Sequence, residues 1–384
     1  MEYKRLGDIA TYINGYPFKP EDRGLTGLPI IRIQDLTGNS YDLGFYNGNY
    51  PERIEINDGD VLISWSASLG VYIWNNGKAL LNQHIFKVAF DKCEVNKQFF
   101  VYAVQYKLQE MGAKAHGATM KHIVKKDFDN TAIPFPAFEE QEKIAQTMNC
   151  ISRIISDRQQ QLQMLDELVK ARFVELFGEP EMNIKGWPVV PMSEVCSIGS
   201  SKRIYQSEQS SGGVPFWRIS DLTNLINTGK ATADLYIPEE RYSELQSQGQ
   251  VPIAGDILVT SRGTLGQCYI VKANDKFYFQ DGMISWLSKY VDSITPQYIS
   301  YLFTMSGFRK QIDSMQAGST VAYLSIAMIK KLKIMLPPKE LQEQFANFVE
   351  QTDKSKVAVQ KALDEAQLLF DSLMQKYFGR EGVV

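Results

Sequence analysis

The sequence predicts an α+β fold in which two similar mixed α/β domains alternate with two long helices, as a tandem duplication would produce. The segment "PIIRIQDLT" at residues 29–37 returns as "PFWRISDLT" at 215–223, with six of nine positions identical. Further matched segments follow in the same order along the 384 residues. Each copy also ends in a long stretch with helical periodicity. An ordered repeat of this kind is the mark of a duplicated structural unit.

The distance between matched segments grows in two steps along the chain. It is 186 residues for the phrase above and 196 between "DGDVLISWSASLG" at 58–70 and "AGDILVTSRGTLG" at 254–266. It reaches 201 between "PAFEEQEKIA", which starts at 136, and "PPKELQEQFA", which starts at 337. Chance similarity would not keep this order. Insertions of ten and then five residues in the second copy account for the growth.

The repeat predicts four segments of two alternating kinds. They are a first head at residues 1–136, a central helix segment at 137–180, a second head at 181–337 and a C-terminal helix segment at 338–384. The heads contain short β-rich runs such as "LPIIRI", "DVLISW", "DILVTS" and "CYIVKA", separated by Gly, Asn and Pro turn signals. The helical stretches "KQFFVYAVQYKLQEM" and "PQYISYLFTMSGFRKQI" follow these strands.

Residues 138–177 and 339–378 are predicted to form the long helices. Each run starts after proline, stops at Phe-Gly and carries apolar residues at three- to four-residue spacing. The apolar positions are Ile144, Met148, Ile151, Ile155, Leu162, Leu165, Val169 and Leu176 in the first run and Leu341, Phe345, Phe348, Val359, Ala362, Ala366, Leu369 and Leu373 in the second. A helix with one apolar stripe must cover it. We expect an antiparallel coiled coil with pseudo-two-fold symmetry; the alternative is that each helix packs on its own head.

Motifs and composition argue against catalysis, metal binding and membrane insertion. The sequence has no GxGxxG, GxxxxGK or Asn-Pro-Pro-aromatic motif, and its three histidines form no HxxxH or HExxH pair. Its four cysteines are far apart without a CxxC pair, which favours buried thiols in a reducing cytosol. No apolar run is long enough for a membrane span, and the N-terminus lacks a signal-peptide core. We expect a cytoplasmic, non-catalytic chain.

The chain resembles the specificity (S, HsdS) subunit of a type I restriction–modification enzyme over essentially its whole length. The resemblance rests on the "PxxRxxDLT" phrase, the "GDxL…LG" strand-turn, "GATMKHI" and the helix starts "EEQEKIA" and "ELQEQFA", taken in their ordered double occurrence. It implies that the heads are target recognition domains, each reading one half of a bipartite asymmetric site in double-stranded DNA. It also implies that the helices set the spacer and dock two methyltransferase (M) subunits.

The resemblance further implies that restriction (R) subunits join through the M subunits and that one copy of this chain serves each complex. DNA methylation and phage defence would then be the work of the partners. S-adenosylmethionine, ATP and Mg are expected on those partner subunits, and no cofactor on this chain. Two alternatives stay open. One is the specificity subunit of a related system with a fused methyltransferase–nuclease partner, and the other is a coiled-coil adaptor that makes no DNA contact.

Any DNA surface must come from local clusters of positive charge, because DNA affinity depends on it. Each long helix carries a net charge of −2, which leaves +1 for the rest of the chain. The strongest cluster is "GAKAHGATMKHIVKK" at 112–126, and smaller ones lie in "SSKRIYQ" at 200–206 and "GFRK" at 307–310. The alternative interpretation of the first cluster is a solvated loop–helix face.

Positions that are identical in both heads cannot make the heads read different half-sites. The scaffold or phosphate contacts are therefore expected at Arg32, Asp35, Arg218 and Asp221, and at the shared Gly59-Asp60 and Gly255-Asp256 pairs. The Arg–Asp pairs can equally satisfy each other. Base readers are expected where position matches but chemistry differs. The candidate DNA-binding residues are Tyr16, Lys19, Trp65, Ser66, Ser68, Gln83, His84, Lys114, His116 and Lys121 in the first head and Lys202, Arg203, Tyr205, Ser261, Arg262, Thr264, Gln280 and Asp281 in the second.

Among these candidates, three kinds of side chain suit direct readout of base edges. Arg262 can bond guanine O6 and N7, and Gln83 or Gln280 can pair with adenine N6 and N7. Asp281 can accept a hydrogen bond from cytosine N4. These pairings are predictions about chemistry, and the identity of the half-sites does not follow from the sequence.

Overall fold

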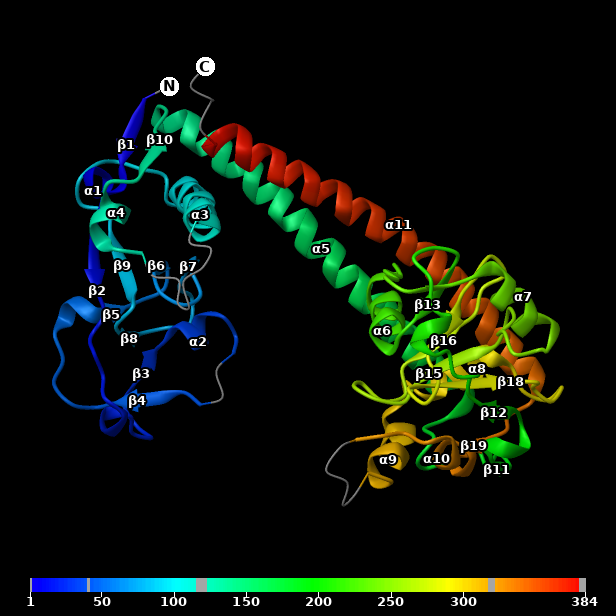
Figure 1. Cartoon of the computed structure of the whole chain (residues 1–384). Coiled ribbons are helices and arrows are strands. Elements are labelled where there is room, and N and C mark those ends of the chain that lie inside the picture. Colours follow the sequence, from blue (N-terminus) through cyan, green and yellow to red (C-terminus); the bar gives the residue numbers. More distant parts are fainter. Residues whose placement is uncertain (1, 40–41, 115–122, 317–321, 380–384) are drawn as a thin grey trace. The chain divides into compact units, whose positions relative to one another are not determined.

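The computed structural model describes residues 2–39, 42–114, 123–316 and 322–379. The chain divides into two compact units, unit 1 with residues 1–160 and 359–384 and unit 2 with residues 161–358. Both passages between the units fall inside the long helices α5 (Phe138–Phe177) and α11 (Lys339–Phe378), drawn in green and red in Figure 1. Each unit therefore contains one head and part of each long helix.

The two long helices have the bounds that the sequence predicts, and each is 40 residues long. Helix α5 ends at Gly178, whose φ of 82° lies in the left-handed region that favours glycine. The Gly178 N–H donates to the carbonyl of Val174 at 2.8 Å. Lys185 Nζ and the Trp187 indole then donate to the Glu175 and Phe177 carbonyls, at 2.7 Å and 2.9 Å, which satisfies the free end of the helix.

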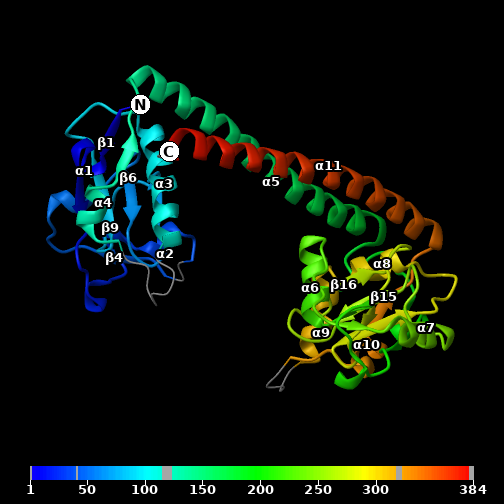
Figure 2. The ribbon, with the colours of Figure 1, turned by 45° about the horizontal axis from the view of Figure 1, so that its top comes forward.

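The first head contains two small sheets and a strand pair. Its elements are β1 (Tyr3–Arg5), α1 (Leu6–Ile9), β2 (Thr11–Asn14), η1 (Pro20–Asp22), β3 (Leu28–Ile31), α2 (Ile33–Leu36), β4 (Gly44–Tyr46), η2 (Glu52–Ile54), β5 (Glu55–Ile56), β6 (Val61–Ser64), β7 (Gly70–Ile73), β8 (Ala79–Leu81), β9 (Ile85–Ala89), α3 (Lys97–Lys114), α4 (Lys125–Asp129) and β10 (Ala132–Pro134). The sheet orders are β2-β9-β6-β7 and β4-β3-β8-β5, and β1 pairs with β10. Helix α3 contacts the edge strand β7, and Figure 2 shows it beside the sheet that contains β6 and β9.

The second head repeats this plan. Its elements are β11 (Val189–Pro191), η3 (Met192–Glu194), β12 (Ser197–Gly199), η4 (Gln206–Glu208), β13 (Val214–Trp217), α6 (Ile219–Thr228), β14 (Tyr236–Ile237), α7 (Glu239–Ser247), β15 (Ile257–Thr260), β16 (Cys268–Ile270), β17 (Tyr278–Phe279), β18 (Ile284–Ser288), α8 (Pro296–Leu302), α9 (Ser306–Ser314), α10 (Ile326–Lys331) and β19 (Lys333–Met335). The sheet orders are β12-β18-β15-β16 and β14-β13-β17, and β11 pairs with β19. The duplication in sequence is therefore a duplication in fold.

Equivalent strands keep the same pairing and the same burial in both heads. β3 runs parallel to β8, and β13 runs parallel to β17. All four residues of β6, and all four of β15, are buried, as expected of central strands that are covered on both faces. The ten-residue insertion appears as the longer helix α6, which has ten residues where α2 has four, together with α7.

One predicted helical stretch in the second head is broken in two. The sequence pattern at 296–312 predicts a single helix, whereas the structure has α8 and α9 with a break at residues 303–305. Helix α9 begins at Ser306-Gly307, where an added Cβ on Gly307 would lie 2.8 Å from the backbone of Glu181. Close approach of another segment therefore fixes a glycine at this point, and the chain turns before the second helix starts.

The first half of α5 and the last part of α11 pack together in the core of unit 1. Ile144 and Met148 of α5 join Met374 and Phe378 of α11 in a cluster with residues of β6, β9 and α3. In unit 2 the partners are reversed, because Phe173 of α5 lies against Phe345 of α11 with ring centroids 5.4 Å apart. The early part of each helix thus meets the late part of the other, which confirms the antiparallel pairing.

The two predicted packing modes of the long helices occur together. Lys356 Nζ of α11 lies 2.7 Å from Asp166 Oδ1 of α5, so the helices contact each other directly. Their ends also form part of the core of a head, so neither mode excludes the other.

The predicted apolar stripe is partly wrong. It includes Leu369, which is 51% exposed, and it omits six buried apolar residues: Ala145, Phe173, Phe177, Val349, Met374 and Phe378. An α-helix has 3.6 residues per turn, so positions at a strict seven-residue repeat drift away from the buried face. The seam follows this drift over the length of each helix.

Candidate nucleic-acid interface

The arginine and aspartate of the repeated phrase pair with each other at the start of a helix. The pairs are Arg32–Asp35 and Arg218–Asp221. In each pair the aspartate Oδ2 accepts from both the backbone N–H and the Nε of the arginine, at 2.8 and 3.2 Å in the first head and at 2.9 and 3.3 Å in the second. A further carboxylate, Asp42 or Asp234, faces each guanidinium. This geometry favours a scaffold role over phosphate contact.

The Gly-Asp pairs that both heads share also have a structural role. Gly59 and Gly255 have φ of 85° and 93°, which only glycine adopts without strain. Asp60 lies 2.9 Å from Lys87 Nζ, whereas Asp256 accepts a 2.8 Å hydrogen bond from the indole of Trp286. Burial raises the pKa of Asp256. The carboxylates hold neighbouring strands together and are not directed at a ligand.

The turn between β8 and β9 gathers four of the predicted DNA-binding residues of the first head. The Gln83 N–H donates to the Tyr16 carbonyl at 2.9 Å, and the Trp65 N–H donates to the His84 carbonyl at 3.3 Å. The Ile123 N–H in turn donates to the Trp65 carbonyl at 3.0 Å. We call Tyr16, Trp65, Gln83 and His84 the first turn cluster.

His84 has an unusual backbone conformation for a residue with a side chain. Its φ is 73°, in the left-handed region that costs an ordinary residue about 1–2 kcal/mol. Its ring meets the Trp65 ring edge-on with centroids 5.0 Å apart, and its Nδ1 is buried with no hydrogen-bond partner among the described residues. The corresponding turn of the second head is one residue longer and places Gly282 at a φ of 70°. The two heads therefore share a turn whose side chains differ.

The second head builds its turn on the same backbone hydrogen bonds. The Gln280 N–H donates to Trp217 at 2.9 Å, the Ser261 N–H to Met283 at 2.9 Å and the Leu324 N–H to Ser261 at 3.0 Å. Their counterparts in the first head join Asn82 to Ile31, Trp65 to His84 and Ile123 to Trp65. A common frame thus carries unlike side chains, as the comparison of the repeats predicts.

Side chains of the second head meet around this turn in two contacts. Arg203 Nε donates to Asp281 Oδ2 at 2.9 Å. The guanidinium of Arg262 lies over the ring of Tyr323 at 5.5 Å, and the Tyr323 hydroxyl donates to the Gly282 carbonyl at 3.0 Å. The second turn cluster is Arg203, Arg262, Gln280, Asp281 and Tyr323.

Tyr323 is a residue that the sequence predictions miss. It lies 201 positions after His122, in the segment that follows the repeated "GAT" and "GST". The available signal was that both copies carry a polar aromatic residue, His122 or Tyr323, shortly after this shared motif. It could not reveal the arginine that the ring would meet, because Arg262 lies 61 residues earlier in the chain.

Two of the predicted base readers have buried side chains. Ser261 is 1% exposed, and its hydroxyl lies 2.9 Å from the hydroxyl of Ser285. Ser66 is 6% exposed. Ser261 directly follows β15, and Ser66 comes two residues after the end of β6. Neighbouring positions of a strand face opposite sides, and the sequence does not reveal which side is covered. In this fold their side chains belong to the core and do not reach a ligand.

Other predicted residues lie at matched positions beside the clusters. Lys19 and Tyr205 precede the short helices η1 and η4 at equivalent positions, and both side chains are exposed. Lys202 occupies the place of Tyr16 and contacts Gln248. Thr264, like Ser68 in the first head, gives its carbonyl to a hydroxyl of the preceding strand, here Thr260 at 2.6 Å. Lys114 ends α3; its side chain, His116 and Lys121 lie outside the described residues.

Several described residues of the predicted basic clusters have partners within the protein. In the 112–126 cluster, Lys125 pairs with Asp129 at 3.0 Å. The 307–310 cluster is structural, because Arg309 donates to the Leu265 carbonyl at 2.9 Å and Lys310 pairs with Glu181 at 2.6 Å. Both side chains therefore have partners within the protein, and the DNA role of this cluster stays a prediction. The charges of a linear segment did not reveal that α9 turns both residues toward its own head.

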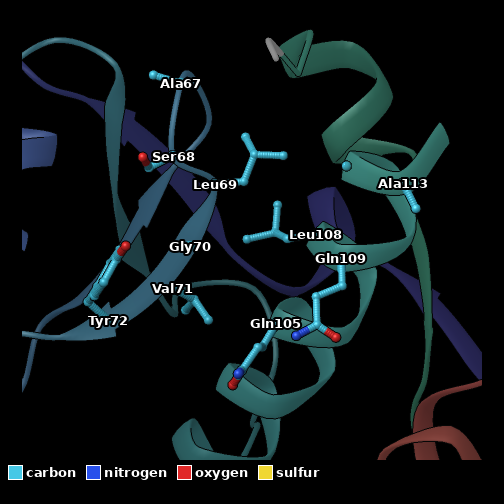
Figure 3. Close-up of a pocket in the computed structure, with 11 residues that line it drawn as sticks. Ala67, Ser68, Leu69, Gly70, Val71, Tyr72, Gln105, Leu108, Gln109 and Ala113 are labelled. Atoms are coloured by element: carbon cyan, nitrogen blue, oxygen red, sulfur yellow. The ribbon is translucent and has the colours of Figure 1, made fainter. Parts of the chain in front are cut away.

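A cavity of about 670 Å³ lies beside the first turn cluster, between β7 and α3. Leu69 and Leu108 face each other across it, and Gln105 and Gln109 supply amides from the α3 side (Figure 3). Ser68 is one of the residues that border it. The described lining carries no carboxylate, histidine or cysteine, so it offers no catalytic set.

The described part of the chain contains no group of three or more histidine, cysteine, aspartate or glutamate side chains that could hold a metal ion. Within the same residues, no helix combines the length and the apolar character needed to cross a bilayer.

The fold and the two turn clusters define a class of protein: a duplicated chain whose two equivalent α+β heads present different polar side chains from one frame. A family model described as "Type I restriction modification DNA specificity domain" matches residues 1–164 and 184–366. The chain belongs to this family of type I restriction–modification specificity proteins, which confirms the resemblance in the sequence.

Individual relatives cover nearly the whole chain. It is 25% identical to the type I restriction enzyme MjaVIII specificity subunit of Methanocaldococcus jannaschii, over 94% of this chain and 89% of that protein. It is 24% identical to the EcoBI specificity subunit of Escherichia coli, over 98% of this chain and 85% of that protein. The crystal structure of an S subunit from M. genitalium has a TM-score of 0.59 at 16% identity, and covers 99% of this chain and 96% of that one. The structural likeness supports the fold.

Proposed function

We propose that this chain is the non-catalytic DNA-reading subunit of a type I restriction–modification complex. Each head reads one half of a bipartite asymmetric site in double-stranded DNA, and one copy of the chain joins two M subunits in the cytoplasm, with R subunits bound through them. The single observation that carries this proposal is the pair of turn clusters. One backbone frame occurs twice, and the polar side chains on it differ between the heads.

The two turn clusters have the chemistry of base-edge readers. Gln83 and Gln280 are not buried. Gln83 lies within the turn between β8 and β9, and Gln280 is the first residue of the turn between β17 and β18. Arg262 is exposed and belongs to the residue type that most often contacts guanine. Asp281 is already paired with Arg203, so it would read cytosine only after exchanging that partner. Arg262 is therefore the strongest candidate in the second head.

Replacing Arg262 by alanine is expected to relax sequence preference at one base pair of one half-site. A bidentate arginine–guanine contact gives about 1–3 kcal/mol of discrimination, so the preference should fall roughly 10- to 100-fold. Competition binding with duplexes that carry single base-pair changes measures this. The other half-site provides the internal control and should keep its full preference. Equal loss in both halves, or no loss, contradicts the assignment.

We also propose that α5 and α11 fix the spacing between the half-sites. Successive grooves of DNA face the same side only about every 10 base pairs, so two readers on one chain need a defined separation. The paired helices are the segments in which the chain passes between the two units, at 160/161 and at 358/359. Their direct contacts, such as the Lys356–Asp166 ion pair, support the role of a stiff connection.

Inserting one heptad into each helix near these two passages is expected to lengthen the spacer without changing either half-site. Seven helical residues add about 10 Å, which corresponds to roughly three base pairs at 3.4 Å each. A genome-wide methylation map of cells with the lengthened chain reads out the motif. A matched insertion of the same heptad in the exposed 247–250 turn of the second head is the control. An unchanged spacer, or altered half-sites, would refute the ruler role.

Exposed apolar residues on the helices, which include one repeat-equivalent pair, are proposed to dock the M subunits. The first turns of the two helices, residues 139–149 and 340–350, carry Ile144, Met148 and Phe345 into the head cores. The exposed apolar residues lie further along: Met164, Leu168 and Val357 in unit 2, and Ile154, Leu368 and Leu369 in unit 1. Leu168 and Leu369 are 201 positions apart, so they are equivalent in the repeat, and their exposed fractions are 49% and 51%. One equivalent exposed leucine in each unit suits two like partners.

A second candidate function is a protein adaptor without DNA contact. The unlike turn clusters disfavour it, since an adaptor needs no readers of different chemistry on one frame. A specificity subunit whose partner fuses methyltransferase and nuclease shares every feature above, and the neighbouring genes distinguish that case.

A further inference from the structure

We propose that Tyr323 is a positioning residue, which holds the guanidinium of Arg262 in the orientation that reads a guanine in the half-site of the second head. This inference rests on the proposed function and goes beyond it, because it assigns the ligand of one side chain and the device that orients it. The juxtaposition that carries it is the Arg262 guanidinium over the Tyr323 ring, at 5.5 Å.

Hydrogen bonds hold both the backbone and the side chain of Tyr323. Its backbone N–H donates to Gln316 Oε1 at 2.8 Å, and its hydroxyl donates to the Gly282 carbonyl at 3.0 Å. The next residue, Leu324, is fully buried and donates its N–H to the Ser261 carbonyl at 3.0 Å. The backbone that precedes Arg262 is thus joined directly to the backbone that follows Tyr323. This hydrogen bond holds the segment that carries the Tyr323 ring beside the segment that carries Arg262.

A guanidinium that is held over a ring by cation–π attraction uses none of its N–H donors in that contact. Arg262 forms no hydrogen bond or ion pair within the described residues, whereas Arg203 is paired with Asp281. A planar fork with free donors matches the O6 and N7 acceptors of guanine. A flexible arginine loses rotamer freedom when it binds, and prior ordering on a ring reduces that loss. The stack therefore strengthens the discrimination that Arg262 supplies.

The first head lacks this pair. Ser66 occupies the place of Arg262 and is buried, and His122, the counterpart of Tyr323, lies outside the described residues. Among the described residues, the contact between an arginine and a tyrosine ring is therefore found in the second head alone, as expected of a feature that makes the two half-sites differ.

The test uses the full chain purified with its M subunits and duplexes that carry the methylated motif found for the wild-type complex. The variants are Tyr323→Leu, Tyr323→Phe, Arg262→Ala and the double variant with Tyr323→Leu. Tyr323→Leu should lower the preference for one G·C pair about fivefold, because exposed cation–π contacts are of that strength. Tyr323→Phe keeps the ring and should keep most of the preference. Adding Tyr323→Leu to Arg262→Ala should change nothing further, since coupled residues are not additive.

Three results would overturn the inference. In the first, Tyr323→Leu keeps the wild-type preference for the G·C pair. In the second, adding Tyr323→Leu to Arg262→Ala lowers the preference by a further full step. In the third, Tyr323→Leu lowers the affinity equally for every sequence and makes its salt dependence shallower, which marks a phosphate contact. Should Tyr323→Leu lower the Tm by more than about 4 °C, Tyr323→Met, which also removes the ring, replaces it in the same cycle. A wild-type complex without any sequence preference would instead refute the proposed function itself.

Discussion

Replacing Phe345 by alanine is expected to destabilise unit 2 by about 3–5 kcal/mol, since that is the cost of removing a buried phenylalanine from a close-packed core. Phe345 is fully buried. Its ring lies edge-on to Phe173, Phe177 and Tyr301, with centroids 5.4, 5.5 and 5.1 Å away. It joins α11, α5 and α8 at one point. The alanine variant leaves a cavity where two long helices meet the second head.

The loss of stability should be confined to unit 2. Hydrogen exchange on the full chain should show faster opening of α8 and of the late part of α5, while the first head keeps its protection. Val357→Ala is the matched control on the same helix, because Val357 is 70% exposed and such surface changes cost little. A Phe345→Ala variant as stable as Val357→Ala would show that the aromatic cluster does not hold the helices to the head.

Introducing an aspartate at each of the two repeat-equivalent leucines, Leu168→Asp with Leu369→Asp, is expected to abolish assembly with both M subunits. A charge in the apolar centre of an interface loses its hydration without a partner, and central interface residues contribute about 2 kcal/mol or more each. That corresponds to a dissociation constant weaker by roughly 30-fold per site. The two residues lie in different units but are equivalent in the repeat.

The single variants make the prediction sharper. Leu168→Asp or Leu369→Asp alone should leave a complex with one M subunit, which native mass spectrometry of the co-expressed proteins distinguishes from the complex with two. Gln159→Asp, at an exposed polar position of α5, is the control for added charge. Retention of both M subunits by the double variant would exclude these leucines as docking contacts.

The large features of this fold follow from its sequence because they depend on ordered repetition and on helix signals. The 40-residue helices begin after proline and end at Phe-Gly, and both signals act locally. The equivalence of the heads follows from the constant order of matched segments. The strand order within each sheet does not, because pairing such as that of β3 with β8 joins segments some 50 residues apart, and nothing local specifies it.

The turn clusters show the same division between local and distant causes. The repeat comparison identified Gln83, Gln280 and Arg262, because position and chemistry can be compared along a line. It failed at Ser261, whose hydroxyl turns to Ser285 in the core. It also missed Tyr323, since the stack on Arg262 exists only after distant segments meet. Burial and long-range side-chain contacts are set by packing, which a linear pattern does not contain.

The most direct measurement is a genome-wide map of methylated bases in cells that express this chain with its neighbouring subunits, and in cells from which the chain is deleted. We expect one split, asymmetric motif with a fixed spacer, which disappears on deletion. Exchange of the second head for that of a relative should then alter one half of the motif and leave the other half and the spacer in place. An unsplit motif, or a methylation pattern indifferent to the deletion, would contradict the reading of DNA by two unlike heads.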